Sequence, residues 1–213
     1  TGYDGSEAQH QAIRNLASLP IDFTCSMVIT PENVQYFCES VQIAHDNGAK
    51  QFSFTFIIDN DGAEEKDLAY LQKHDPVKLV SGFISQIDKL SAITDDWWVE
   101  YSFPMCVYTE EQLKLLKGRL ATPCQIHLKN AVTFNTKMEL LPCDMYIYQQ
   151  LGKFGRDFSS YQGFLSLTES ANYNKTMDEI RKLPSDECTA CEHFSVCYGG
   201  CPVLWKNYSF AAL

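Results

Sequence analysis

Nine cysteines are the residues of this sequence whose type and spacing could do chemistry. Four of them form a CxxC motif followed, after five residues, by a CxxxC motif. Thiolates at this density pair as disulfides, bind zinc or hold an iron–sulfur cluster. Six cysteines fall in the last 90 residues, namely Cys124, Cys143, Cys188, Cys191, Cys197 and Cys201.

The number and spacing of these cysteines favour an iron–sulfur cluster over disulfide bonds and over a zinc site. An odd number of cysteines in a chain with 45% hydrophobic residues does not resemble a small disulfide scaffold. Two knuckles that share one zinc ion usually have about 12–20 residues between them, and here only 192–196 intervene. Gly199 and Gly200 allow the backbone before Cys201 to approach an inorganic centre closely. Zinc remains the alternative.

Charge and hydropathy exclude two classes of function. The chain has 27 acidic and 17 basic residues, a net charge of −10, and therefore repels nucleic acids. No apolar run reaches the roughly 18 residues that span a bilayer. The first residues, TGYDGSEAQHQ, lack the basic and hydrophobic regions of a signal peptide. We expect a cytoplasmic protein that binds neither nucleic acid nor membrane.

The first half of the chain has an alternating pattern of predicted strands and helices. Strand-like runs rich in β-branched and aromatic residues are separated by segments with apolar residues at helical spacing. A strand–helix–strand order predicts right-handed crossovers and parallel pairing. The predicted fold class is therefore α/β. The expected strands are 21–29, 51–58 and 97–107, and the expected helices are 31–47, starting at Thr30–Pro31, 76–90 and 109–120.

The second half of the chain has a different character. Residues 125–134 and 139–142 flank an Asn–Thr–Lys turn, which predicts a hairpin between Cys124 and Cys143. A loop-rich stretch with several glycines then leads to a short helix over 174–182 and to the CxxC segment. Thr122–Pro123 interrupts the helical pattern. We therefore expect two domains, 1–121 and 122–213.

The motifs of this chain, and their order, resemble those of the radical S-adenosylmethionine enzymes that carry a C-terminal SPASM or twitch domain. DGSEAQHQAIR, with Asp4–Gly5, His10 and Arg14, is similar to the DG…H…R segment that follows the fourth barrel strand in that family. Cys124, thirteen residues, Met138, four residues and Cys143, followed by CxxCx₅CxxxC, resembles the SPASM pattern. The resemblance covers nearly the whole chain, and the cysteine spacing is its most specific part.

The resemblance implies a fold and a set of site residues. Residues 1–121 would be the C-terminal half of a partial (β/α)₆ barrel, and 122–213 a small cysteine-rich α+β domain. Asp4 and Arg14 would shape the end of the barrel that binds S-adenosylmethionine. One auxiliary [4Fe–4S] cluster would be held by Cys188, Cys191 and Cys197, and the other by Cys124, Cys143 and Cys201.

Each of these sets lacks a fourth ligand for a four-iron cluster. Cys106 is interpreted as a core residue, as a residue near substrate, or as the ligand that completes the set of Cys124, Cys143 and Cys201.

Three features depart from the family pattern. The CxxxCxxC motif that binds the catalytic cluster is absent, so we expect it upstream of Thr1 in a longer protein. Met138 stands where the family usually has glycine. The seventh cysteine, normally beyond the CxxxC motif, is missing from the twelve residues after Cys201.

The resemblance also implies a reaction for the intact parent. That enzyme would cleave S-adenosylmethionine to a 5′-deoxyadenosyl radical with electrons from a flavodoxin or ferredoxin, and abstract hydrogen from a peptide or protein side chain. The auxiliary clusters would bind substrate or accept an electron. Residues 1–213 alone would bind clusters without turnover, so whether they act as an enzyme stays open. The alternative function is a zinc-stabilised, non-catalytic interaction module.

Overall fold

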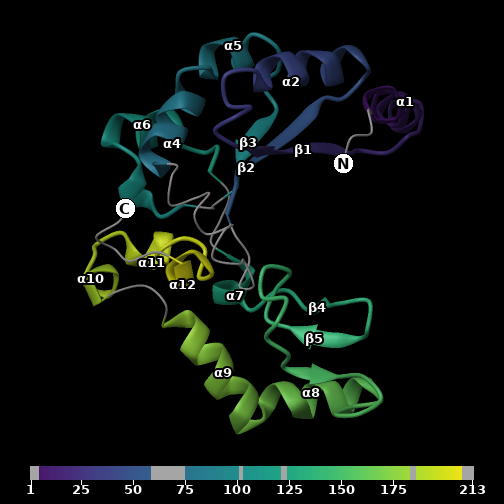
Figure 1. The fold of residues 1–213 in the computed structure, drawn as a ribbon, viewed down its shortest axis with the longest axis vertical. Helices are drawn as coiled ribbons and strands as arrows, with labels where there is room; N and C mark the ends of the chain where they lie inside the picture. Colours follow the sequence, from purple (N-terminus) through teal and green to yellow (C-terminus); the bar gives the residue numbers. More distant parts are fainter. Residues whose placement is uncertain (1–4, 59–74, 101–102, 121–123, 183–185, 208–213) are drawn as a thin grey trace. The chain divides into compact units, whose positions relative to one another are not determined.

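The computed structural model describes residues 5–58, 75–100, 103–120, 124–182 and 186–207 (Figure 1). These residues form a mixed α/β structure that divides into two compact units. The first unit contains the described residues of 5–57, 76–100 and 107–120. The second contains Phe103–Cys106 and the described residues from 124 onward.

The first unit is built on a parallel sheet in the order β1–β2–β3. Cys25 pairs with Phe52, and Phe54 pairs with Val99. The predicted α/β alternation with parallel pairing is confirmed, whereas membership of a six-stranded barrel stays a prediction. The elements are α1 (Ser6–Ala17), β1 (Thr24–Ile29), α2 (Phe37–Asp46), β2 (Gln51–Phe56), α4 (Pro76–Ile84), α5 (Ile87–Ser91), β3 (Trp97–Val99) and α6 (Glu110–Leu115).

Two predicted boundaries in this unit are wrong. Helix α2 begins at Phe37 and not at Thr30–Pro31. The side chain of Asn33 accepts a hydrogen bond from the Thr30 N–H at 2.8 Å and donates one to the Val28 carbonyl at 2.8 Å. These bonds give the backbone an alternative to the helix. The third strand is also shorter than expected, because β3 ends at Val99.

An aromatic core holds the first unit together. The QFSFTF sequence of β2 alternates, so its phenylalanines share one face of the strand, and all three are buried. The Phe83 ring of α4 lies 5.4 Å from Phe54 and 5.6 Å from Phe56, and stacks 5.0 Å from Phe37 of α2. On the opposite face of the sheet, the Ser53 and Ser26 hydroxyls are hydrogen-bonded at 2.7 Å.

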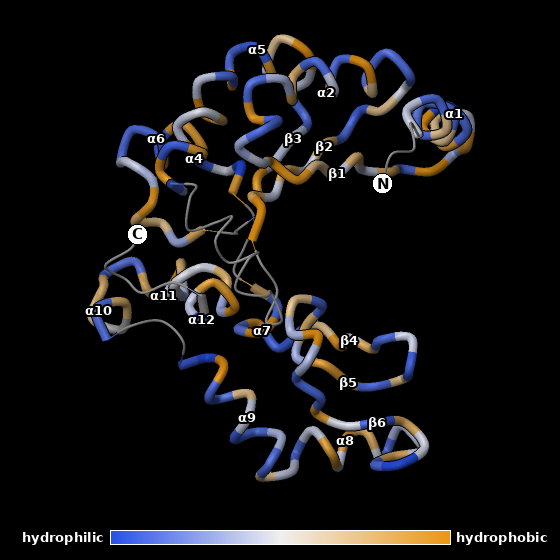
Figure 2. The backbone as a smooth tube through the Cα atoms, in the orientation of Figure 1, coloured by the Kyte–Doolittle hydropathy of each residue, from blue (hydrophilic) through white to orange (hydrophobic). Residues whose placement is uncertain are grey.

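The second unit contains a small antiparallel sheet, β4–β5–β6, followed by helices. Figure 2 shows that α9 is mostly polar with apolar residues interspersed, the pattern of a helix with one buried face. The elements are α7 (Gln125–Leu128), β4 (Thr133–Phe134), β5 (Glu139–Leu141), β6 (Gly152–Lys153), α8 (Tyr161–Glu169), α9 (Ala171–Arg181), α10 (Asp186–Thr189), α11 (Phe194–Cys197) and α12 (Leu204–Asn207).

The predicted hairpin is confirmed in a shorter form. Strands β4 and β5 pair across a turn in which the Asn135 side-chain oxygen accepts hydrogen bonds from the N–H groups of Lys137 and Glu139. Residues 125–128 form helix α7 and no strand. Helix α8 lies in the stretch expected to be loop-rich, and the Ser160 side chain caps its first turn. Among the described residues, no helix is both long and apolar enough to cross a membrane.

We predict that Phe83→Ala will lower the free energy of unfolding of the first unit by about 3–5 kcal/mol, because Phe83 is fully buried among other rings. Ile43→Ala, on the exposed side of α2, is the control and should change stability by about 0.5 kcal/mol or less. Urea unfolding followed by tryptophan fluorescence measures both. Equal effects of the two substitutions would contradict the core position of Phe83.

Candidate metal centres

The cysteine-rich segment consists of three short helical turns, α10, α11 and α12. Cys188 lies in α10, Cys197 ends α11, and Cys201 precedes α12. After Cys197 the chain takes three successive left-handed residues, with φ of 50° at Tyr198, 78° at Gly199 and 76° at Gly200. The Gly200 N–H donates a hydrogen bond to the Cys197 carbonyl at 2.9 Å, so the backbone makes a tight turn between Cys197 and Cys201. Helices of four residues are unstable alone and depend on what surrounds them.

The same local turn occurs at three cysteines that are far apart in the sequence. The carbonyls of Cys124, Cys143 and Cys201 accept hydrogen bonds from the N–H group three residues later, at 2.9, 3.1 and 3.1 Å. In each turn the N–H groups two and three residues after the cysteine also face its sulfur, where they act to lower the pKa of the thiol. N–H groups directed at sulfur are typical of the surroundings of thiolate-bound metals and clusters.

These three thiols form the first group, called here the Cys201 group. Burial, together with negative charge on Cys124 and Cys143, raises the pKa of the Cys201 thiol to about 12. Burial likewise raises the pKa of Cys143 to about 11, with Asp144 and Cys124 contributing. The structure therefore brings Cys124 and Cys143 close enough to Cys201 to oppose its ionisation.

The second group, called here the Cys106 group, contains Cys106, Cys188, Cys191 and Cys197. Surrounding protein raises the pKa of the Cys106 thiol, and negative charge on Cys197, Cys188 and Cys191 raises it further. The Met105 N–H donates a hydrogen bond to the Cys197 sulfur at 3.2 Å. The expectation that Cys106 is a core residue is wrong, because Cys106 is exposed.

The remaining predicted site residues lie elsewhere. Asp4 is outside the described residues. Arg14 lies on α1, where its guanidinium donates hydrogen bonds to Glu7 and Asn47, both at 2.6 Å, and its side chain is 40% exposed. These contacts hold Arg14 in a surface network within the first unit. Its assignment to the cofactor end of a barrel stays a prediction.

The cysteines are free thiols, and free thiols are the donors that a thiolate-bound centre would use. All nine cysteines lie in the described part of the chain, and none of them is in a disulfide bond. Within that part, no three His, Cys, Asp or Glu side chains are close enough together to hold a single metal ion. His127 follows Cys124 by three residues, and its Nε2 is buried with no hydrogen-bond partner among the described residues. Its ring stacks on Tyr198 at 5.0 Å.

Sequence reasoning missed His127, although its CxxH spacing from Cys124 has the length of a metal knuckle. Burial, and secondarily the positive charge of Arg181, lowers the pKa of the imidazole. A neutral imidazole with an unpartnered nitrogen is a competent metal ligand. No local signal in the sequence predicted the position of Cys106, because Met105 and Cys197 are 92 residues apart.

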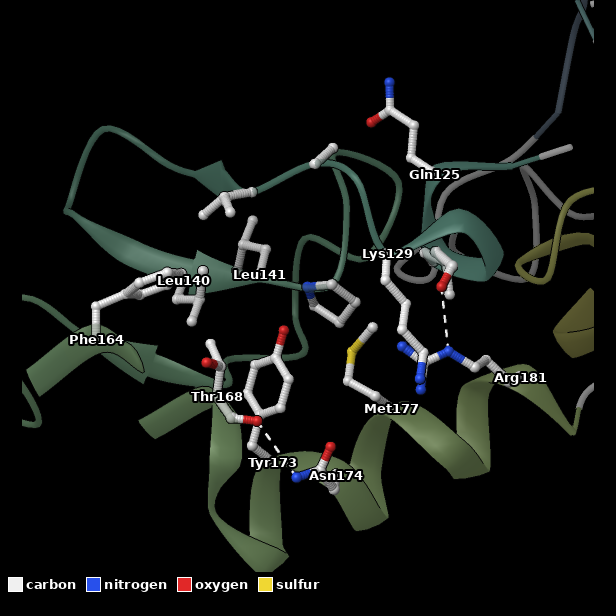
Figure 3. Close-up of a pocket in the computed structure, with 14 residues that line it drawn as sticks. Gln125, Lys129, Leu140, Leu141, Phe164, Thr168, Tyr173, Asn174, Met177 and Arg181 are labelled. Carbon is white, nitrogen blue, oxygen red and sulfur yellow. Dashed lines mark hydrogen bonds between the residues drawn. The ribbon is translucent and has the colours of Figure 1, made fainter. Parts of the chain in front are cut away.

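A pocket of about 270 Å³ lies beside the Cys201 group. Its lining includes Gln125 and Ile126, which follow Cys124, and Pro142, which precedes Cys143. Figure 3 shows Tyr173, Met177 and Arg181 of α9 facing Leu140 and Leu141 of β5 across the pocket.

Two cations, Arg181 and Lys129, also line the pocket. Arg181 is the better anchored, because its Nε donates a hydrogen bond to the Ile126 carbonyl at 3.1 Å and its Nη1 donates one to Asp178 at 3.1 Å. The pocket therefore combines an apolar floor with positive charge.

Comparisons with family models, with curated proteins and with solved structures found no match to this chain.

We predict that Gly200→Ala will destabilise the second unit more than Gly155→Ala. Both glycines have positive φ, 76° and 82°. A Cβ at position 200 would lie 2.8 Å from the Pro104 nitrogen, whereas nothing lies within 4 Å of a Cβ at position 155. Gly155→Ala should cost about 1–2 kcal/mol for its backbone conformation alone, and Gly200→Ala about 1–3 kcal/mol more. Urea unfolding measures the difference in the free energy of unfolding. An equal loss of stability in the two variants would contradict the close contact between Gly200 and Pro104.

We also predict that the metal-free protein will lose stability as the pH rises above about 9. The folded state holds protons on Cys143 and Cys201 up to pH 11 to 12, whereas the ordinary thiol pKa is 9.0. The unfolded chain therefore binds fewer protons in this range, and the free energy of unfolding falls as pH increases through it. Unfolding in urea with reductant at several pH values tests this, with Cys201→Ala as the comparison. Identical pH dependence in the two proteins would show that Cys201 contributes nothing.

Proposed function

We propose that residues 1–213 are part of a radical S-adenosylmethionine oxidoreductase that modifies a peptide or protein side chain. In this proposal the cysteine-rich unit binds two auxiliary [4Fe–4S] clusters. The observation that supports it most is that the CxxCx₅CxxxC motif has two different surroundings. The Cys197 sulfur accepts a hydrogen bond from the Met105 N–H at 3.2 Å, whereas Cys201 opens a turn of the kind found at Cys124 and Cys143. A motif that served a single ion would keep its cysteines together.

The conformation of Met138 gives independent support. Its φ is 59°, in the left-handed region that glycine adopts most readily. The family resemblance places a glycine at this position in the turn before the second cysteine. The backbone thus has the shape that the family residue would require, even though the residue type differs.

The chain's own groups have definite tasks in this proposal. The thiols must release their protons to become ligands, and the N–H groups that face the sulfurs of the Cys201 group stabilise the resulting negative charge. Bound clusters would supply one-electron transfer, with a potential set by charge, hydrogen bonds to sulfur and solvent exposure. Protein residues then position the cluster and exclude water.

The fold of the first unit is compatible with the proposal that residues 1–121 are part of a (β/α)₆ barrel. A parallel β–α layer with helices between successive strands is the repeating unit of (β/α) barrels. S-adenosylmethionine, a flavodoxin or ferredoxin as reductant, and the roles of Asp4 and Arg14 remain implications of the family resemblance.

The pocket beside the Cys201 group is a candidate site for the peptide or protein substrate. A cavity with an apolar floor and a few polar groups is typical of a small-ligand site, and about 270 Å³ is just below the roughly 300–1,000 Å³ of such pockets. The cations Lys129 and Arg181 favour a segment that carries an acidic group.

We predict that the protein, reconstituted anaerobically with iron and sulfide, will absorb broadly near ~400 nm, which zinc–thiolate does not. It should produce no 5′-deoxyadenosine from S-adenosylmethionine, because the CxxxCxxC motif is absent from residues 1–213. Cys191→Ala should lower the iron content because a thiolate ligand is lost. Cys25→Ala, which alters a half-buried cysteine of β1, is the matched control and should leave iron unchanged.

Two results would overturn the proposal. A colourless protein that binds stoichiometric zinc would establish the interaction module instead. Deoxyadenosine formed by the wild-type protein and lost in Cys191→Ala would place the reactive cluster in this region, contrary to the auxiliary role.

A further inference from the structure

The segment Phe103–Cys106 lies against the loop that carries Cys197 and Cys201. Besides the Met105 N–H bond to the Cys197 sulfur, the backbones of the two segments are in close contact at Gly200. A Cβ there would lie 2.8 Å from the Pro104 nitrogen and 3.0 Å from the Phe103 carbonyl carbon. Phe103 itself is buried. The position of residue 106 is thus fixed by contacts on both sides of the Cys197 turn.

This placement brings the Cys106 side chain to the same thiols as the CxxC motif. Successive turns lead from the CxxC motif to Cys197: the Cys191 N–H donates to the Cys188 carbonyl at 3.1 Å, the Phe194 N–H to the Cys191 carbonyl at 3.0 Å, and the Cys197 N–H to the His193 carbonyl at 2.8 Å. The residue before Cys106 is hydrogen-bonded to the sulfur at the end of these turns. This contact favours the thiols of the CxxC motif over the Cys201 group as the partners of Cys106.

We propose that Cys106 is the fourth thiolate ligand of the iron–sulfur cluster that Cys188, Cys191 and Cys197 hold. The inference rests on the proposed function. Four thiolates satisfy the four irons of a [4Fe–4S] cluster, so this site needs no cysteine beyond the CxxxC motif. The Met105 N–H, on the residue beside Cys106, donates to the sulfur of a second ligand and so fixes the relative positions of the two.

Full thiolate ligation has a functional consequence. A cluster without an open iron has no position at which a substrate or S-adenosylmethionine can coordinate. The cluster of the Cys106 group would therefore transfer electrons or stabilise the fold, and direct coordination of a substrate would be left to the Cys201 group. Because Cys106 is exposed, solvent reaches this cluster from its side.

The test compares cluster-loaded wild type with Cys106→Ser, Cys191→Ser, the double variant and Cys25→Ser. We expect Cys106→Ser to lose about four irons per chain, or to convert on mild oxidation to a three-iron cluster detectable by EPR. Cys191→Ser should do the same, and the double variant should lose about four irons per chain and no more, because both residues would hold the same cluster. Cys25→Ser should resemble wild type. Circular dichroism of the metal-free variants checks that each is folded.

A second measurement needs no substitution. Iodoacetamide should alkylate Cys106 readily in the metal-free protein and slowly in the cluster-loaded protein, in parallel with Cys191, as read by mass spectrometry. Rapid alkylation of Cys106 in loaded protein in which Cys191 is protected would overturn the ligand assignment, as would additive iron loss in the double variant. If wild type binds no cluster at all, the proposed function fails and the assignment fails with it. If wild type binds clusters and Cys106→Ser binds as much iron as wild type, the ligand assignment is overturned and the proposed function stands.

Discussion

The backbone N–H groups two and three residues after Cys124, Cys143 and Cys201 face the sulfurs of these residues, so the stability of each turn depends on the charge that its sulfur carries. With protons on the thiols, the N–H groups meet weak acceptors in a buried place. With thiolates bound to a metal centre, the same N–H groups meet strong acceptors. Burial favours the protonated form, so a bound cation, which would stabilise the thiolates, would strengthen these turns.

The two units consequently differ in what stabilises them. In the first, rings from α2, α4, β2 and β3 pack against one another, with Phe54 and Phe83 each 6.3 Å from Trp97. Such a core needs no ligand, because burial of apolar surface supplies the driving force. In the second, helices α10, α11 and α12 have four residues each and too few internal hydrogen bonds to form alone. These helices depend on contacts with segments distant in the sequence, such as the hydrogen bond between Met105 and Cys197.

The sequence predicts the features that arise from local periodicity. The alternation in QFSFTF predicts the face that β2 buries, and Asn–Thr–Lys predicts the turn between β4 and β5. The start of α2 was missed because the Asn33 side chain bonds to backbone on both sides of its turn, a geometry that residue type alone does not specify. Helix α8 was missed because Gly163 suggested a loop, whereas the Ser160 side chain accepts a bond from the Gly163 N–H and starts the helix there.

The candidate site is predictable in composition and less so in arrangement. The spacing of the CxxC and CxxxC motifs selects thiolate chemistry, and the family resemblance distributes the six cysteines between two sets. In the ligand set that we propose, however, the fourth thiolate beside Cys188, Cys191 and Cys197 comes from residue 106, and nothing in the residues around Cys106 indicates which distant segment it meets. Long-range placement of this kind is decided by packing of the whole unit, here by Phe103 and Gly200.

The contact between Gly200 and Pro104 has a consequence for hydrogen-bond satisfaction. Pro104 is buried, and a Cβ at position 200 would lie 2.8 Å from its nitrogen. A residue with an N–H at position 104 would need a hydrogen-bond partner in this buried place, and a donor left without one costs about 1–3 kcal/mol. Proline has no N–H, so the two backbones can close on each other without leaving a polar hydrogen unpaired. The sequence of the 103–106 segment is thus restricted at a position that touches the cysteine loop only through its main chain.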